Sequence, residues 1–311
     1  MFDDDYTTQL FSYKDKKLDV QGQEIGSGPL GTVQGYGDLR NPQKPPGHVI
    51  KLLYSKNIKE FQVLFRSVFL NSNHDSPLIL SASNAYVDDF KPKGFKIAIK
   101  YPKMKSSLEE VIQNLKKASG KKGANSYLPK AKILEYLYSI ALGLDYLKKK
   151  RISHQNLKPT NVLFDFEGHI KLMDIGLAQE YIQNDTASFI IGKRGPEFFK
   201  AFETFLTPRL EHKKDFYSAD IWSLGMIILE LCVINAPAIT PFTDPDKRDK
   251  IVKQCLEEIK GRYGEDFASL LESMLRVDPG KRITVSEVIE TLKTNYPDIK
   301  VIFPYEVFLN K

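Results

Sequence analysis

A group of glycines near the N-terminus has the spacing of a phosphate-binding loop. The stretch IGSGPLGTV holds Gly26, Gly28 and Gly31 in the pattern G-x-G-x-x-G, followed by Val33. Glycines let the backbone pass close to phosphates and present its N–H groups to them. A turn between two strands would also use glycines, so both interpretations stay open. A dinucleotide-binding fold needs a helix directly after the third glycine, and the strand-like TVQGYGD that follows disfavours that fold.

Lys51 is the second residue whose type and position indicate chemistry, because it follows the apolar strand residues of HVIK. A buried lysine needs an anion, which phosphate oxygens or a helix carboxylate would supply. The commoner arrangement is a strand-end lysine that points into water. Glu60 is the only acidic residue between Lys51 and Asp75 and is therefore the possible carboxylate partner. The rival interpretation is local, because Asn57 and Glu60 have the spacing of a helix start in which Glu60 reaches back to its own cap.

Five further motifs follow along the chain. They are HQNLKPTN from His154 to Asn161, MDIG with Asp174, AFE ending at Glu203, DIWSLG beginning at Asp220, and DPGKRIT with Arg282. Each motif alone is a weak signal, but the set in this order is specific and resembles the eukaryotic protein kinases. The resemblance runs from about residue 19 to about residue 292, and LKPTN is more similar to the serine/threonine type than to the tyrosine type.

The resemblance implies a site for ATP and Mg²⁺. The residues that would surround the nucleotide are Ile25, Gly26, Gly28, Gly31, Val33, Lys51 and Tyr101. Within this set Lys51 would hold the α- and β-phosphates, and Lys158 would face the γ-phosphate. Asn161 and Asp174 would bind Mg²⁺ through hard oxygen ligands of the kind that this ion prefers.

Three further positions carry structural roles by the same resemblance. Asp220 would accept hydrogen bonds from the backbone of the loop at residues 154–161. Glu203 and Arg282 would form a buried ion pair that anchors the activation segment. These roles would survive a loss of catalysis.

The catalytic loop departs from the family at Asn156, where the resemblance expects the catalytic aspartate. An amide can accept a hydrogen bond from a hydroxyl, but it cannot take a proton near neutral pH. Positioned general-base catalysis contributes ~10²–10⁴-fold in rate. The sequence therefore predicts a pseudokinase that keeps the ATP and Mg²⁺ apparatus and acts as a binding or scaffolding module. A slow serine/threonine kinase and a purely structural protein that binds no nucleotide are the alternatives.

Other departures point in the same direction. Gln155 replaces the arginine that binds an activation-loop phosphate in many kinases, and Phe202 replaces the proline of A-P-E. The threonine expected before that motif is missing. Pro102 falls where a backbone N–H usually donates to adenine, and proline has no such donor. The loss of one net hydrogen bond, worth ~0.5–1.5 kcal/mol, would weaken nucleotide binding without abolishing it.

Composition limits the class of protein. The chain has 311 residues, 42% of them hydrophobic and 27% charged, which is ordinary for a globular protein with a substantial core. A net charge of +6 does not by itself favour nucleic acid. Two cysteines imply no disulfide framework, and the acidic N-terminus does not have the pattern of a signal peptide. We expect a cytoplasmic protein or part of an intracellular assembly, without membrane insertion, whose protein partner docks on the kinase fold itself.

Hydrophobic periodicity supplies the elements that must position these residues. Strands are expected at 18–26, 32–39, 47–54 and 95–101, and helices at 57–70, 130–149 and 219–232, the last apolar nearly all round and therefore buried. This order predicts an α+β bilobal fold that forms a single kinase-like domain over residues 1–311. A β-rich N-lobe with one main helix would span residues 19–101, and a helical C-lobe would span residues 102–300, with short terminal extensions.

Overall fold

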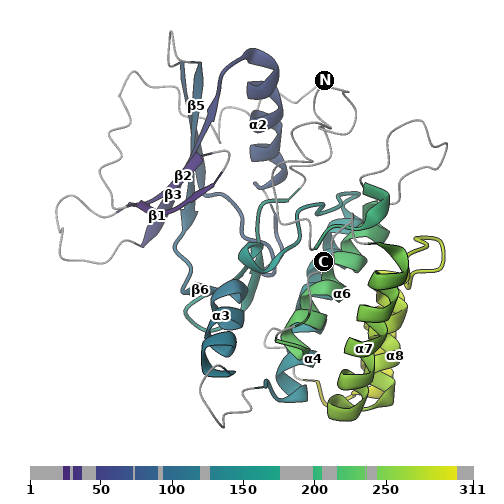
Figure 1. Cartoon of the computed structure of the whole chain (residues 1–311). Helices are drawn as coiled ribbons and strands as arrows, with labels where there is room; N and C mark the ends of the chain where they lie inside the picture. The colour runs from purple at the N-terminus through teal and green to yellow at the C-terminus, as the bar shows by residue number, and fades with distance from the viewer. Residues whose placement is uncertain are drawn as a thin grey trace.

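An antiparallel sheet of five strands forms the first part of the structure (Figure 1). The structure is a computed structural model that describes residues 24–28, 31–36, 47–72, 74–89, 94–119, 127–175, 199–204, 216–234, 236 and 244–299. The strand order is β1-β2-β3-β5-β4. The strands are β1 (Glu24–Gly28), β2 (Gly31–Tyr36), β3 (His48–Ser55), β4 (Asn84–Asp89) and β5 (Phe95–Pro102).

Lys51 occupies the middle of this sheet. It pairs with Val33 on β2 and with Ile99 on β5. Successive side chains of a strand point to opposite faces of the sheet, so the apolar side chains of β3 are divided between two clusters, one on each face. Ile50 and Leu52 pack with Ala98 on one side of the sheet.

The other apolar cluster joins the sheet to the helix α2 (Ile58–Leu70). Leu64 and Val68 of α2 are buried against Leu53, Ile97 and Ile99 of the sheet. The helix lies alongside the sheet in Figure 1. Burial of this face fixes the position of α2 relative to the strand that carries Lys51.

Gly31 is required by the approach of two strands. A Cβ atom at this position would lie 1.6 Å from the backbone oxygen of Leu52, far inside van der Waals contact. Only a residue without a Cβ therefore fits where β2 pairs with β3. Strand pairing alone therefore explains why the third position of the G-x-G-x-x-G pattern is glycine, whether or not a ligand binds.

The second part of the structure is mainly helical (Figure 1). Its helices are α3 (Leu108–Ser119), α4 (Lys130–Lys149), α6 (Phe216–Cys232), α7 (Pro245–Tyr263), α8 (Glu265–Met274) and α9 (Val285–Asn295). The central helix is α6, which is buried along most of its length, as its continuous apolar sequence predicts. The described residues of this part also include two short 3-10 helices, η1 (Pro159–Asn161) and η3 (Phe202–Thr204), and a small sheet of β6 (Ser106–Ser107), β7 (Val162–Phe164) and β8 (Ile170–Leu172).

A seam of hydrogen bonds joins the chain after α2 to the strand β8. The backbone N–H of Leu80 donates to Leu172 O, and the N–H of Leu172 donates to Leu78 O, both at 2.8 Å. The Lys171 ammonium donates to the carbonyl of Pro77 at 2.5 Å. These bonds tie the first part of the structure to the second, directly beside the segment that leads to Asp174.

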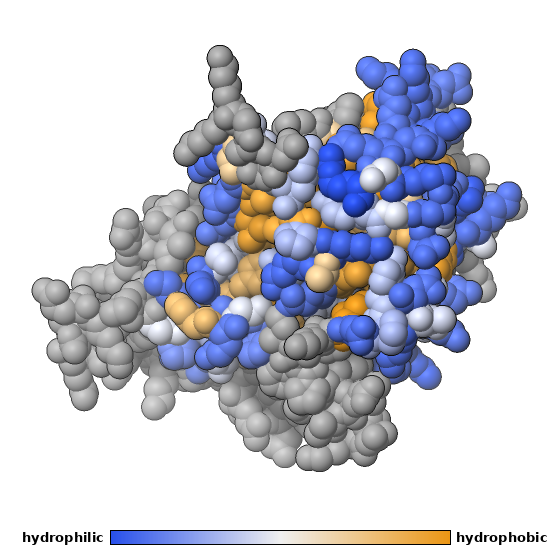
Figure 2. Space-filling view, turned by 90° about the horizontal axis from the view of Figure 1, so that it is seen from below, coloured by the Kyte–Doolittle hydropathy of each residue, from blue (hydrophilic) through white to orange (hydrophobic). Residues whose placement is uncertain are grey.

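The expected α+β architecture, with a β-rich first part and a helical second part, is confirmed. In the described part of the chain, no helix is long and apolar enough to cross a membrane. On the face shown in Figure 2, hydrophilic residues are interspersed with several smaller hydrophobic areas.

Candidate nucleotide and metal site

The central helix α6 holds the loop at residues 153–161 in place. Asp220 of α6 is buried and accepts hydrogen bonds from the backbone N–H groups of His154 and Gln155, both at 2.7 Å. Gln155 has a left-handed backbone with φ 57°, which is unfavourable for a side chain that is neither glycine nor asparagine. Hydrogen bonds from two consecutive N–H groups to one carboxylate offset that cost and fix the loop.

Asn156 and Asn161 are linked within the same loop. The Asn161 Nδ2 atom donates to the backbone oxygen of Asn156 at 2.7 Å. The Asn161 backbone oxygen accepts the N–H of Met173 at 3.0 Å, which brings the loop alongside the chain that reaches Asp174. The Asn156 N–H donates to His154 Nδ1 at 3.3 Å. The backbone of Asn156 therefore orients the amide of Asn161.

Lys51 and Asp174 form an ion pair between the sheet and the helical part. The Lys51 Nζ to Asp174 Oδ1 distance is 2.5 Å, and each side chain is 16% exposed. Asp174 has a left-handed backbone with φ 60°. The pKa of Lys158 is lowered, mainly by burial. The charge of Asp174 raises this pKa and the charge of Lys51 lowers it, so Lys158 lies in the same electrostatic environment as the ion pair. Two lysines and one aspartate thus concentrate charge where the two parts of the structure meet.

The donor set around Asp174 is suitable for a divalent cation. Asn161 uses its amide nitrogen for the bond to Asn156, and none of the described residues donates to its Oδ1 atom. Asp174 has a second carboxylate oxygen beyond the one that contacts Lys51. A carboxylate and an amide oxygen are the hard ligands that Mg²⁺ takes in proteins. The residues present therefore fit this ion.

Glu60 lies at the start of α2 and is used locally. The Glu60 N–H donates to Asn57 Oδ1 at 2.9 Å, and the Glu60 carboxylate accepts the N–H of Lys56 at 3.0 Å. This is the reciprocal arrangement of a helix start, with the backward contact one residue earlier than the cap. Among the described residues, the ion-pair partner of Lys51 is Asp174.

The remaining positions expected around the nucleotide lie at one end of the sheet. Gly26 of β1 pairs with Val33 of β2, and the last pair of this ladder is Gly28 with Gly31. Ile25 belongs to β1, between Glu24 and Gly28. The pairing of β1 with β2 is compatible with the phosphate-loop interpretation, because it leaves Gly28 and Gly31 at the end of the ladder.

Tyr101 and Pro102 end β5. The Tyr101 side chain is buried in the core under the sheet, where burial and the charge of Asp174 raise its pKa. The Tyr101 side chain is therefore not available to a ligand. Pro102 pairs with His48 in the register of the sheet, and the next N–H, that of Lys103, donates to Gly47 O at 3.0 Å.

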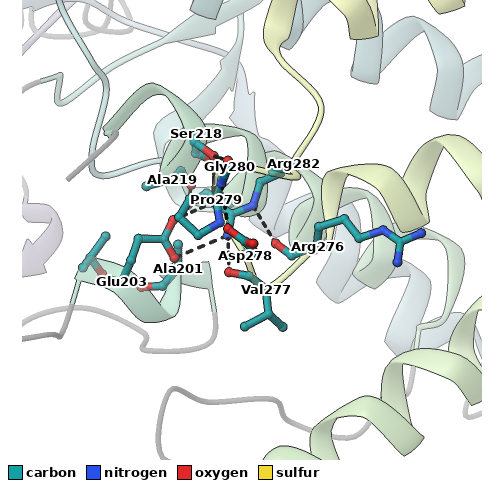
Figure 3. A network of polar contacts seen from close by, with 12 residues as sticks. Ala201, Glu203, Ser218, Ala219, Arg276, Val277, Asp278, Pro279, Gly280 and Arg282 are labelled. Carbon is teal, nitrogen blue, oxygen red and sulfur yellow. Dashed lines mark hydrogen bonds and ion pairs between the residues drawn. The ribbon is translucent and has the colours of Figure 1, made fainter. Parts of the chain in front are cut away.

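Arg282 and Glu203 form a buried ion pair near the N-terminal end of α6 (Figure 3). The guanidinium donates to both carboxylate oxygens of Glu203, at 2.6 and 3.3 Å. It also donates to the backbone oxygens of Ser218, Arg276 and Val277 at 2.8, 2.9 and 3.2 Å. The Arg282 side chain is fully buried and that of Glu203 is 11% exposed. The segment around Glu203 is thereby fastened to α6 and to the loop after α8.

Phe202 strengthens the same attachment. Its ring packs on the Trp222 ring in a T-shaped arrangement with centroids 5.0 Å apart, and the guanidinium carbon of Arg248 lies 4.8 Å from the centroid of the Phe202 ring. The departure from the family's proline therefore gives a packed aromatic contact on α6. Residues 176–198, in which the missing threonine falls, lie outside the described residues.

The sequence did not single out two other features. Asp165, Glu167 and His169 bring potential metal ligands within 4.8 Å of one another in the turn between β7 and β8. Asp165 already bonds His169 Nδ1 at 3.0 Å, and the positive charge of Lys171 acts on the same carboxylates, so the group stabilises a turn. The i, i+4 spacing of Asp165 and His169 is the sequence pattern that could have indicated this contact.

A hollow of about 540 Å³ between α7 and α8 is the second such feature. Its lining includes the apolar side chains of Trp222 and Leu275 and a mixture of cations and anions such as Arg248 and Asp249, which pair with each other. The mixture of charges marks no particular ligand. Lys51, Asn161 and Asp174, which the sequence did single out, therefore remain the centre of the candidate site.

Comparison with known proteins agrees with this geometry. The model of the family described as "Protein kinase domain" matches residues 20–292. The chain is 32% identical over 152 residues to G protein-coupled receptor kinase 4 of Mus musculus, covering 48% of this chain and 25% of that protein. It is 31% identical over 156 residues to the serine/threonine-protein kinase RUNKEL of Arabidopsis thaliana, covering 50% of this chain and 11% of that protein. It is 28% identical over 288 residues to the human serine/threonine-protein kinase Nek11, covering 90% of this chain and 40% of that protein.

The chain thus spans less than half the length of each of these relatives, and the match to the family model covers most of the chain. The chain belongs to the protein kinase domain family.

Proposed function

We propose that this chain is a pseudokinase that binds ATP with Mg²⁺ and has lost useful phosphotransfer. The observation that carries the proposal is Asn156 at the catalytic aspartate position, in a loop otherwise built to hold Asn161 and Asp174. Such a protein acts as a binding or scaffolding module, and a protein partner would dock on the kinase fold itself.

Nucleotide binding is supported by three side chains. Lys51 would leave Asp174 to contact the phosphates, while Asp174 and Asn161 would hold Mg²⁺. When bound, the ion supplies positive charge that neutralises the phosphate oxygens. In the absence of ligand, the Lys51–Asp174 pair keeps both charges in place at the centre of the candidate site.

Loss of phosphotransfer is supported by the lack of another base in the described part of the loop. The Asn156 amide does not accept a proton near neutral pH. His154 is fully buried, burial lowers its pKa to about 4, and its Nδ1 atom already accepts the N–H of Asn156. Lys158 is a cation that would face the transferred phosphate. None of these groups would take the proton of a substrate hydroxyl.

The retention of Lys51, Asn161 and Asp174 is also what a slow serine/threonine kinase requires. Phosphoryl transfer depends mainly on positioning and electrostatic stabilisation, so a small rate without a general base is compatible with this site. A purely structural protein has no need of these three residues. Binding of nucleotide separates the structural alternative from the others, and turnover separates the first two.

The test is a titration of the purified chain with MgATP, followed by thermal unfolding and calorimetry. A ligand at ~100 times its dissociation constant stabilises the folded state by ~2.7 kcal/mol. Lys51→Ala and Asp174→Ala should each remove the shift. Lys56→Ala is the matched control, because Lys56 is an exposed lysine just beyond the same strand.

Turnover is measured as labelled phosphate transferred to a basic protein substrate, with Asp174→Ala as the blank. The proposal expects no transfer above that blank. Robust transfer by the unmodified chain would favour the slow kinase, and the absence of any shift at millimolar MgATP would favour the purely structural protein.

A further inference from the structure

The end of α2 carries a polar side chain that is bonded to the segment after Asp174. Asn71 follows the helix directly and is buried. Its Oδ1 atom accepts the backbone N–H of Ile175 at 2.9 Å, and its Nδ2 atom donates to the backbone oxygen of Ile175 at 3.0 Å. One carboxamide therefore holds both polar groups of a single residue of the backbone.

These two bonds act on a strained part of the chain. Asp174, directly before Ile175, has φ 60°, a left-handed conformation that an aspartate adopts only at a cost. Such conformations persist where the surrounding structure over-determines them. Ile175 is fully buried, so water does not replace the carboxamide as a partner for its N–H and carbonyl groups.

The surrounding contacts prevent Asn71 from moving with Ile175. The backbone of Asn71 is fixed separately, because its oxygen accepts the N–H of Ala82 at 2.8 Å and its N–H donates to Val68 O at 3.2 Å. The hydrogen bonds between residues 78–80 and Leu172 hold the same stretch of chain that follows α2. The carboxamide thus extends from a backbone that other hydrogen bonds hold in place, and it contacts the segment that carries Asp174.

We propose that Asn71 is a positioning residue of the metal site, which fixes the backbone at Ile175 and thereby presents the Asp174 carboxylate to Mg²⁺. The proposal rests on the proposed nucleotide-binding function and deepens it. The leucine side chain has the same branching and number of heavy atoms as that of asparagine but neither donates nor accepts a hydrogen bond. In Asn71→Leu the Asp174–Ile175 segment is free to leave its left-handed conformation, and the carboxylate is no longer aimed at the ion.

The matched control is Ser72→Ala. Ser72 is the next residue, is equally buried, and its hydroxyl donates to Val68 O at 2.6 Å. The substitution removes one buried hydrogen bond at the same end of α2 without touching Ile175. Effects that come only from loosening this end of the helix should therefore appear in both variants.

The first measurement is amide hydrogen exchange of the ligand-free chain at Ile175, followed by NMR or by overlapping peptides. Asn71→Leu should exchange this amide about tenfold faster or more, since one net hydrogen bond corresponds to roughly that factor. Ser72→Ala should leave the rate as in the unmodified chain. Equal protection of Ile175 in Asn71→Leu and in the unmodified chain would overturn the proposal.

The second measurement is the gain in ATP affinity on addition of Mg²⁺, taken as the ratio of the dissociation constants in EDTA and in Mg²⁺. Asn71→Leu should lose most of this gain while its affinity in EDTA stays unchanged, and Ser72→Ala should keep the gain. A full Mg²⁺ gain in Asn71→Leu would refute the positioning role. If the unmodified chain binds no nucleotide at all, the proposed function and the metal role both fail, and the exchange measurement still decides whether Asn71 fixes Ile175.

Discussion

Replacing Arg282 by leucine should destabilise the chain by about 4 kcal/mol. The guanidinium is fully buried and serves two carboxylate oxygens of Glu203 and three backbone oxygens. Its removal leaves the Glu203 carboxylate, itself only 11% exposed, without its cation. Breaking a buried pair in this way costs about 3–5 kcal/mol, because the remaining charge stays desolvated. This loss is a large fraction of the ~5–15 kcal/mol that stabilises a typical domain.

The physical reason can be isolated with a double-mutant cycle. If the cost lies mainly in the stranded charge, Glu203→Leu with Arg282→Leu should recover at least about 2 kcal/mol relative to Arg282→Leu alone. Free energies of unfolding come from urea titration followed by far-UV circular dichroism. Lys281→Ala is the control, since Lys281 is exposed and lies 3.9 Å from Asp278, and it should change stability by less than about 0.5 kcal/mol. Equal destabilisation of the single and the double variant would refute the reasoning.

Three further predictions follow from other parts of the structure. Burial lowers the pKa of His154 to about 4 in the folded chain, against an ordinary value of 6.5, so between these values the unfolded chain binds a proton that the folded chain does not. The free energy of unfolding therefore decreases as the pH falls through this window. In urea titrations, the decrease between pH 7 and pH 5 should be about 2 kcal/mol larger for the unmodified chain than for His154→Phe. Gly31→Ala should cost at least about 1–3 kcal/mol in the same assay because its Cβ would meet Leu52 O, whereas Gly47→Ala, whose Cβ meets nothing within 4 Å, should be nearly neutral. Asn156→Asp should raise phosphate transfer far less than the ~10²-fold of a restored general base, since residues that act as a unit are not recovered singly; a full 10²-fold gain would mean that Asn156 is the main lesion.

Local patterns in the sequence predicted some of the parts of the structure that local physics decides. The apolar stretch at 219–232 predicted a buried helix, and α6 is buried. The spacing of Asn57 and Glu60 predicted a helix start, and the structure has hydrogen bonds of that kind there. Both features depend on residues that are neighbours in the chain. The choice between this local arrangement and a pair with Lys51 depended on tertiary packing, which the spacing alone did not contain.

Elements that depend on distant partners were not visible in the sequence. β4 and the strands β6 to β8 are too short or too polar to show alternation, and they exist because neighbouring strands offer hydrogen bonds. Asn71 reads as an ordinary polar residue after a helix. Its contact with Ile175 appears only when the end of α2 meets the segment after Asp174. The kinase-like motifs located Asp174 but contained no information about what supports it.

The contact between Asn71 and Ile175 also has a consequence for how the protein forms during synthesis. It joins residues 104 positions apart. The strand β3 and the helix α2 leave the ribosome well before Ile175 does, and N-terminal regions generally fold first. The Asp174 segment therefore cannot reach its final shape until it docks on an end of α2 that is already in place. We expect the N-terminal part to act as the template for this segment, and a chain that lacks α2 to build the helical part without a usable metal site.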